Sequence, residues 1–302
     1  MEPPVDTNAS SVSLDSAPVS SAPRELYRIR PQVWVGDMLL DWAVIIGVFV
    51  FMAYFWSWWL VPLASLIIGA RIHALGLLAH DATHRLAFKS RRLNELFGEV
   101  IVAWPLLIVI DEGYRPWHFD HHRHLGSHND PELGSYRAAS PYDKPVTWKM
   151  VCLYFIHDML GLGLPGLLKF SAAIYPNKQP WRIGGPVALW LAFFLITFFY
   201  HSTWIFWLYS WSLISGFWAV FRVRTWTEHV GIEHRGKETS HRFITGPIGR
   251  FLFFPHNTFC HYEHHKWPQI PYYNLPKLRA MDASRPVQPL GDLFPMLHGD
   301  RV

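Results

Sequence analysis

Two long stretches without any charged side chain dominate the hydrophobic pattern of the chain. Residues 42–70 and residues 184–221 contain no Asp, Glu, Lys or Arg. A membrane-spanning helix takes about 20 apolar residues, so each stretch is long enough for two spans. We therefore expect four spans in two helical hairpins. The alternative, buried helices of a large soluble protein, is disfavoured because two uncharged hairpins of spanning length are difficult to bury.

The first hairpin is predicted over roughly residues 37–56 and 60–79, with its turn near Ser57 and Pro62. Tryptophans at positions 56, 58 and 59 flank this turn, as expected for aromatic residues at a membrane interface. The second hairpin turns near His201 and Ser202.

Two further apolar segments, residues 93–111 and 151–170, lie between the hairpins, and each is interrupted by carboxylates and proline. We interpret them as interfacial or re-entrant helices. Residues 1–30 are rich in Ser, Pro and Ala and lack an apolar run, so they are expected to form a disordered tail. The predicted organisation is thus a tail, a membrane domain over residues 31–285, and a C-terminal tail over residues 286–302.

The composition supports a membrane location: 17% of the residues are charged, against about 25% in a typical soluble domain. Neither predicted turn contains Lys or Arg, whereas basic residues collect at the opposite ends of the spans. The positive-inside rule then places both termini in the cytoplasm. The net charge of +4 requires no nucleic-acid partner. Two cysteines, Cys152 and Cys260, are too few for a disulfide framework and are expected to remain reduced.

Histidines form three short clusters on the side of the basic residues. "HDATH" follows the second predicted span and places His80 and His84 four residues apart, on one face of a helix. The other two clusters, "HFDHH" and "HYEHH", share the spacing HxxHH. On a helix the first ring and the later pair lie on one side, and the adjacent pair diverges by about 100°. One such motif can therefore contact two neighbouring metal ions.

A ninth histidine, His229, lies in "TEHVG" just after the fourth predicted span. Because an even number of crossings returns the chain to the same side, all nine rings can meet there. The candidate ligands are His80, His84, His118, His121, His122, His229, His261, His264 and His265.

Nine imidazoles are too many for one ion, since a structural zinc site closes at four ligands. Two ions that share the nitrogens are the economical arrangement. Imidazole suits zinc, copper, iron and nickel, and iron is the redox-capable choice if dioxygen is the oxidant. Asp81, Asp120, Glu228 and Glu263 are candidates to orient the rings from outside. Each of them could equally be an ordinary carboxylate of a helix surface.

These boxes resemble the signature of the transmembrane fatty acid desaturase superfamily, HxxxH, HxxHH and HxxHH around two membrane hairpins. The resemblance covers roughly residues 40–285. The ending "HYEHHKWPQIPYYNLPKL" is similar to that of bacterial acyl-lipid desaturases and, more loosely, of carotenoid ketolases.

The resemblance implies a mostly helical membrane enzyme of the bacterial inner membrane, with a non-haem di-iron centre in a cytoplasmic histidine-rich cap. It implies that O2 is consumed, that a double bond is introduced into a fatty acyl chain attached to a lipid, and that two irons are bound per chain. The haem motif HPGG of a fused cytochrome b5 domain is missing from the sequence. Electrons are therefore expected from a separate donor, ferredoxin or a cytochrome b5 type protein with its reductase.

Several alternatives remain open from the sequence. The same centre could hydroxylate or ketolate a carotenoid, sterol or alkane, or desaturate a small non-lipid metabolite. A membrane zinc hydrolase is a remote alternative, because "HDATH" has Asp81 where the motif HExxH requires a glutamate base. A metal transporter is also disfavoured, since transporters hold ions near the bilayer midplane.

Overall fold

The computed structural model describes residues 22–132, 147–175, 177–230, 232 and 236–296. Within these ranges the chain is mainly helical. The only sheet that they contain is a parallel pair of two-residue strands, β1 (Phe243–Ile244) and β2 (Gln288–Pro289). The predicted all-α class is therefore confirmed.

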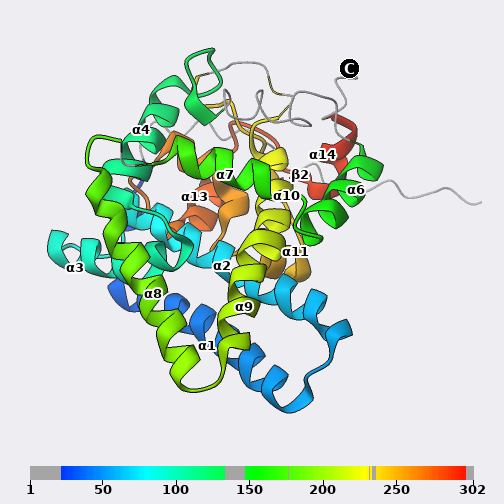
Figure 1. Cartoon of the computed structure of the whole chain (residues 1–302). Helices are drawn as coiled ribbons and strands as arrows, with labels where there is room; N and C mark the ends of the chain where they lie inside the picture. The colour runs from blue at the N-terminus through cyan, green and yellow to red at the C-terminus, as the bar shows by residue number, and fades with distance from the viewer. Residues whose placement is uncertain (1–21, 133–146, 176, 231, 233–235, 297–302) are drawn as a thin grey trace, which may run out of the picture.

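Four helices are long and apolar enough to cross a membrane, and they form the two expected hairpins (Figure 1). In the first hairpin, α1 (Pro31–Phe55) turns through Trp58–Leu60 into α2 (Val61–Thr83). The second hairpin consists of α8 (Gly184–Phe199), α9 (Thr203–Ser212), the π-helical turn η7 (Leu213–Phe217) and α10 (Trp218–Glu228). Both hairpins turn at the same end of the molecule. The first hairpin is longer than predicted, because α1 begins at Pro31 and α2 ends at Thr83.

The four spans divide into outer and inner helices. In their most apolar windows, α1 is 22% buried and α8 is 11% buried, whereas α2 and the α9–α10 span are each 61% buried. Large apolar side chains such as Phe51 and Phe199 remain exposed on the outer helices, as lipid-facing residues would. At the turn of the first hairpin, Trp58 and Trp59 are exposed, as a membrane interface favours.

The inner helices approach each other backbone to backbone at two glycines. A Cβ atom added to Gly69 on α2 would lie 2.2 Å from the amide nitrogen of Phe217. A Cβ atom added to Gly216 on η7 would lie 2.0 Å from the carbonyl oxygen of Ser65. Small residues are common where membrane helices pack closely, because they let the backbones touch. This contact fixes the relative position of the two helices that lead to the histidines.

Two charged residues inside the first hairpin, Asp41 and Arg71, pair with each other. Arg71 Nη1 on α2 donates to Asp41 Oδ1 on α1 over 3.0 Å, and both side chains are buried. His256 Nε2 lies 2.7 Å from the other oxygen of Asp41. A charged side chain at membrane depth costs free energy unless it is paired with another charge. This network of paired charges explains how the spans can contain Asp41 and Arg71.

The two interrupted apolar segments form sharply bent helix pairs. The first pair, Arg91–Leu106 and Ile110–His124, is bent by 84°, and the second pair, Trp148–Met159 and Leu164–Ala173, by 85°. Each pair is either re-entrant or one broken span, in agreement with the expected interruption. The helices in these pairs are α3 (Arg91–Glu95), the π-helical η3 (Leu96–Ala103), η4 (Trp104–Leu106), the π-helical η5 (Ile110–Tyr114), α4 (Arg115–His124), α6 (Trp148–Met159) and α7 (Leu164–Ala173).

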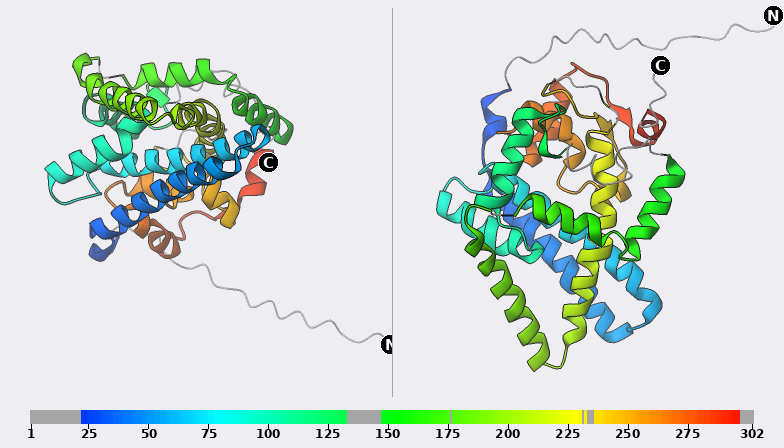
Figure 2. Two further views of the ribbon diagram at one scale, coloured as in Figure 1. Left: turned by 60° about the horizontal axis from the view of Figure 1, so that its bottom comes forward. Right: turned by 45° about the horizontal axis from the view of Figure 1, so that its top comes forward.

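The remaining elements form a cap at the end opposite the hairpin turns (Figure 2). They are η1 (Arg24–Tyr27), η6 (Pro180–Ile183, at the start of α8), α11 (Pro247–Leu252), η8 (Thr258–Cys260), α12 (His261–Lys266), η9 (Tyr272–Asn274), α13 (Leu275–Met281) and α14 (Leu290–Met296). Residues 22–30, which the sequence assigns to the tail, include the turn η1, whose Leu26 is buried and accepts a hydrogen bond from Asn274. The C-terminal segment after residue 286 contributes β2 and α14.

Candidate metal centre

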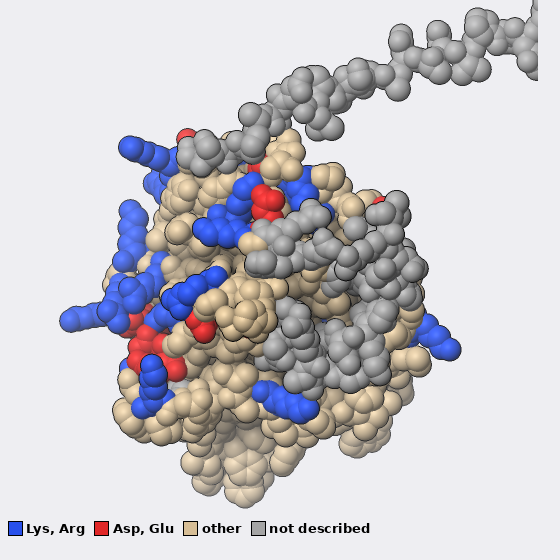
Figure 3. Space-filling view, turned by 90° about the horizontal axis from the view of Figure 1, so that it is seen from above, with Lys and Arg blue, Asp and Glu red and all other residues tan. Residues whose placement is uncertain are grey.

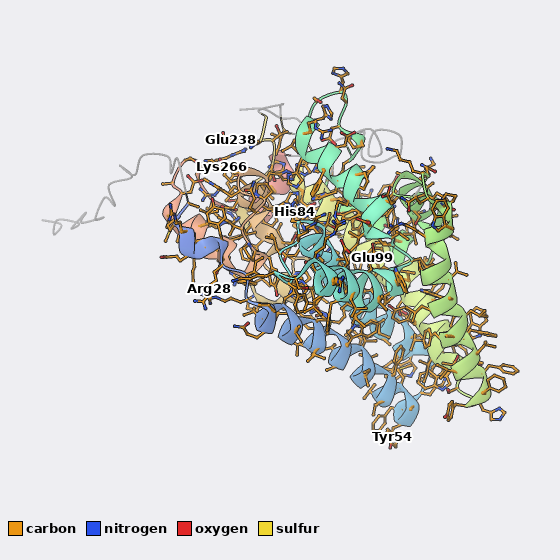
Figure 4. The ribbon with its side chains drawn as sticks, turned by 90° about the vertical axis from the view of Figure 1, so that its left-hand side faces the viewer. Arg28, Tyr54, His84, Glu99, Glu238 and Lys266 are labelled. Carbon is orange, nitrogen blue, oxygen red and sulfur yellow. The ribbon has the colours of Figure 1, made fainter. Side chains whose placement is uncertain are left out.

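Four chain segments bring the nine predicted histidines to the cap ends of the inner helices. His80 lies in the last turn of α2, and His84 is the residue that ends this helix. His229 has the same position after α10. The HxxHH motifs form α4 and the short helix α12. In Figure 4, His84 lies in the interior of the molecule, far from Tyr54 near the turn of the first hairpin.

The rings converge in two separate groups. The first contains His80, His84, His118, His122 and His264; the second contains His121, His229, His261 and His265. Within each group, one ligand atom from every residue lies within 4.8 Å of all the others. The groups adjoin, since the ring centroids of His122 and His265 are 4.5 Å apart. Each HxxHH motif contributes to both groups. Its two adjacent histidines point in different directions on the helix, so His121 and His122 belong to different groups, as do His264 and His265.

The spacing of the nitrogens fits donors around a cation. His118 Nε2 lies 2.9 Å from His84 Nε2 and 3.0 Å from His122 Nε2. In the second group, His261 Nε2 lies 2.9 Å from the Nε2 atoms of His229 and His265. Two nitrogens bound to one metal at about 2.1 Å and at right angles are about 3.0 Å apart. Both groups therefore have donor separations that suit a bound ion.

Burial keeps most of these rings neutral, which is the form that binds a metal. His121 is the exception: burial lowers its pKa, but the carboxylates of Glu132 and Asp130 outweigh burial and raise the pKa to about 10. Burial lowers the pKa of His84 to about 3, and Arg115 adds to the effect. Burial, opposed by weaker hydrogen bonding and carboxylate effects, lowers the pKa of His229 to about 4. The pKa values of His261, His264 and His265 are also far below the ordinary value, mainly because of burial.

Three rings of the second group are oriented through their other nitrogen. His121 Nδ1 lies 2.8 Å from Asp130 Oδ1, and His229 Nδ1 lies 2.7 Å from the carbonyl oxygen of Thr239. His261 Nδ1 lies 3.3 Å from Glu228 Oε1. Such contacts fix the tautomer and direct Nε2 towards the centre of the group.

The four carboxylates proposed from sequence differ in their roles. Glu228 contacts a ring of the second group, as expected for an orienting residue. Asp120 is exposed and pairs with Arg123. Asp81 accepts from the amide of Tyr272, and Glu263 pairs with two arginines. Sequence reasoning missed Asp130 and Glu132, both of which contact His121. The sequence that could have indicated them is "HNDPE" (residues 128–132), which begins six residues after the last histidine of the second box.

The side chain of Glu263, which lies between His261 and His264 in the third histidine box, is fully buried and pairs with two arginines of the cap. Arg242 Nε donates to Glu263 Oε1 over 2.6 Å, and Arg279 Nη2 donates to Oε2 over 2.7 Å. Removing one partner of a buried ion pair typically costs about 3 to 5 kcal/mol.

We expect Glu263→Gln to lower the free energy of unfolding by about this amount, because two buried guanidinium groups lose their counter-charge. Thermal unfolding of the metal-free protein measures it. The matched control is Asp120→Asn, which breaks an exposed ion pair and should cost about 1 kcal/mol or less. Equal losses for the two variants would contradict the assignment of Glu263 as the central anion of the cap.

A small cavity adjoins both histidine groups. Its volume is about 30 Å³, and it is lined by His80 and His264 of the first group, His261 of the second, and the polar residues Asp81 and Asn257. A cavity of about 10 to 15 Å³ or more can hold one water molecule. A water or a diatomic molecule therefore fits beside the donors. Cys260 also lines this cavity, and burial raises the pKa of its thiol to about 12, which disfavours a nucleophilic role.

The fold and the histidine groups define a multi-pass membrane protein with a candidate metal centre built from imidazoles. Comparison with known proteins specifies the class further. The model of the fatty acid desaturase family matches residues 56–289. The chain belongs to this family and is an oxidoreductase.

Its relatives act on different substrates. A dihydrorhizobitoxine desaturase of Bradyrhizobium elkanii is 36% identical over 124 residues, which cover 40% of this chain and 35% of the relative. A beta-carotene ketolase of Paracoccus sp. (strain PC1) is 28% identical over 68% of this chain and 73% of the relative. An sn-1 acyl-lipid omega-3 desaturase (ferredoxin) of Synechocystis sp. is 25% identical over 86% of this chain and 76% of the relative.

Proposed function

We propose that the protein is an O2-dependent di-iron desaturase that introduces a double bond into a fatty acyl chain carried by a lipid. The observation that carries the proposal is the pair of adjoining histidine groups, with five and four converging nitrogens. Two groups at one end of the spans suit two ions that act on one substrate. Several relatives are acyl-lipid desaturases by name, which supports the substrate class.

The nine histidines would hold the two ions, five nitrogens on one and four on the other. Two irons held there would supply the reductive activation of O2 and the removal of two hydrogens from neighbouring methylenes. The overall reaction consumes O2, two electrons and two protons, and it yields an alkene and two waters.

The residues around the centre support this chemistry by shielding and orientation. None of the nine histidines is exposed: His80, His84 and His122 are partly buried, and the other six are buried, namely His118, His121, His229, His261, His264 and His265. The small cavity at His80, His261 and His264 provides space for O2 between the donor groups. Asp130, Thr239 and Glu228 hold three rings in the tautomer that presents Nε2.

We place the cap and both termini in the cytoplasm of a bacterial inner membrane. The support is the distribution of charge: the two hairpin turns lack Lys and Arg, whereas basic side chains are spread over the cap face (Figure 3). Electrons would then arrive from a cytoplasmic donor. Three of the relatives carry ferredoxin in their names, which favours ferredoxin over a cytochrome b5 type donor.

A ketolase or hydroxylase is the second candidate, and the match to the beta-carotene ketolase supports it. One experiment separates the two functions: membranes of an expressing host are supplied with reductant, ferredoxin and ¹⁸O2, and extracted lipids are analysed by mass spectrometry. Desaturation predicts acyl chains two hydrogens lighter and free of ¹⁸O. Incorporation of ¹⁸O without a new double bond would establish the second candidate instead.

Metal analysis of the purified protein tests the centre itself. We expect about two irons per chain. Stoichiometric zinc in an active preparation would overturn the proposal and favour hydrolysis.

A further inference from the structure

His121 is the one ring of the centre with a carboxylate at each nitrogen. Its Nδ1 lies 2.8 Å from Asp130 Oδ1, and its Nε2 lies 2.9 Å from Glu132 Oε2. The His121 side chain is 1% exposed and that of Glu132 is 11% exposed. The second contact therefore lies in an environment with little water.

The position of Glu132 is set by the turn that follows α4. Asp130 accepts hydrogen bonds from the backbone amides of Gly126 and Glu132, over 2.8 and 3.0 Å. The same carboxylate faces His121 Nδ1. Asp130 thereby fixes both the ring and the start of the segment that carries Glu132. The approach of Glu132 to Nε2 is a consequence of this local structure.

The contact at Nε2 has a clear electrostatic requirement. A neutral imidazole has one N–H and one lone pair. If Asp130 accepts the N–H of Nδ1, the lone pair of Nε2 points at a carboxylate oxygen, and the two repel each other unless a second proton on the ring or a metal ion compensates the charge. The nitrogens of His229, His261 and His265 converge on the same region, within 4.8 Å of the donor atom of His121.

We propose that Glu132 supplies a carboxylate oxygen to the ion held by the four-histidine group. This inference rests on the proposed metal centre and changes its donor set. With Glu132, each group offers five protein donors: five nitrogens in the first, and four nitrogens with one oxygen in the second. The two ions are then chemically different, because only the second has an anionic ligand, which favours its oxidised state.

The test uses purified full-length protein loaded with ⁵⁷Fe, with Glu132→Gln as the variant and Asp120→Asn as the control. Asp120 is an exposed carboxylate on α4, the helix that precedes Glu132, and contacts Arg123. We expect E132Q to bind the second iron at least about tenfold more weakly, a loss in the range seen when metal-site partners are removed. Its Mössbauer spectrum should lose or shift one of two components, while D120N matches the wild type.

The alternative is that Glu132 only accepts a hydrogen bond from a protonated His121. In that case E132Q would keep both irons with wild-type affinity and an unchanged Mössbauer spectrum, which would overturn the inference. If E132Q does not accumulate as folded protein, infrared difference spectra of the wild type with and without iron replace it. A shift of a carboxylate band that is labelled by ¹³C-glutamate supports ligation, and an unshifted band contradicts it.

Failure of the inference and failure of the proposed function give different results. Wild-type protein that binds no iron would overturn the metal centre altogether. Wild-type protein with two irons and an indistinguishable E132Q variant would overturn only the role of Glu132.

Discussion

Replacement of His264 by alanine is expected to abolish product formation and to lower the iron content below two per chain. His264 Nε2 lies 3.0 Å from His122 Nε2, and the ring also packs against His80 and His84, with centroid distances of 4.5 and 4.8 Å. Its loss removes one of five donors and enlarges the small cavity beside them. Mutation of a residue that hydrogen-bonds to a metal ligand typically lowers metal affinity or activity by about 10- to 100-fold. Loss of a ligand should reduce turnover by at least about 100-fold.

The matched control is His128→Ala. His128 lies in the same histidine-rich region, is exposed, and belongs to neither group. This variant should retain the iron content and the product of the wild type. Both variants are compared by metal analysis and by lipid mass spectrometry after equal amounts of protein are confirmed. Full turnover by the His264 variant would show that this ring is no ligand.

Substitution of Gly216 by valine is expected to prevent accumulation of folded protein. A Cβ atom at this position would lie 2.0 Å from the carbonyl oxygen of Ser65, and the obstacle is backbone, which cannot rotate away as a side chain can. The inner helices would have to separate, and α2 and α10 would no longer bring His80 and His229 together. We expect a loss of more than about 3 kcal/mol, above the usual cost of overpacking.

Gly47→Val serves as the control for this substitution. Gly47 lies on the outer helix α1, and a Cβ atom there meets no other atom within 4 Å. The amount of monodisperse protein extracted from membranes and its thermal unfolding measure both variants. Wild-type yield and stability of the Gly216 variant would contradict the close contact between α2 and η7.

Much of the fold could be predicted from the sequence because the spans are defined by local composition. Two uncharged stretches of sufficient length predict two hairpins without any knowledge of packing. The predicted positions of the helix ends were less accurate, because α1 begins at Pro31, well before the uncharged stretch that starts at residue 42. The charged residues inside the first hairpin gave no indication of their partners. The pairing of Asp41 with Arg71 requires two helices at a particular rotation about their axes.

For the centre, the sequence by itself determined which nine imidazoles could meet and on which side of the spans, because motif spacing fixes helix faces and the number of crossings fixes the side. Only the tertiary structure decided how the rings divide into five and four, and that Asp130 and Glu132 reach His121. The physical reason is that ligand grouping depends on the distances and rotations between four separate segments. The contact of Gly69 and Gly216 and the ion pairs of the cap set these distances, and no local pattern in the chain encodes them.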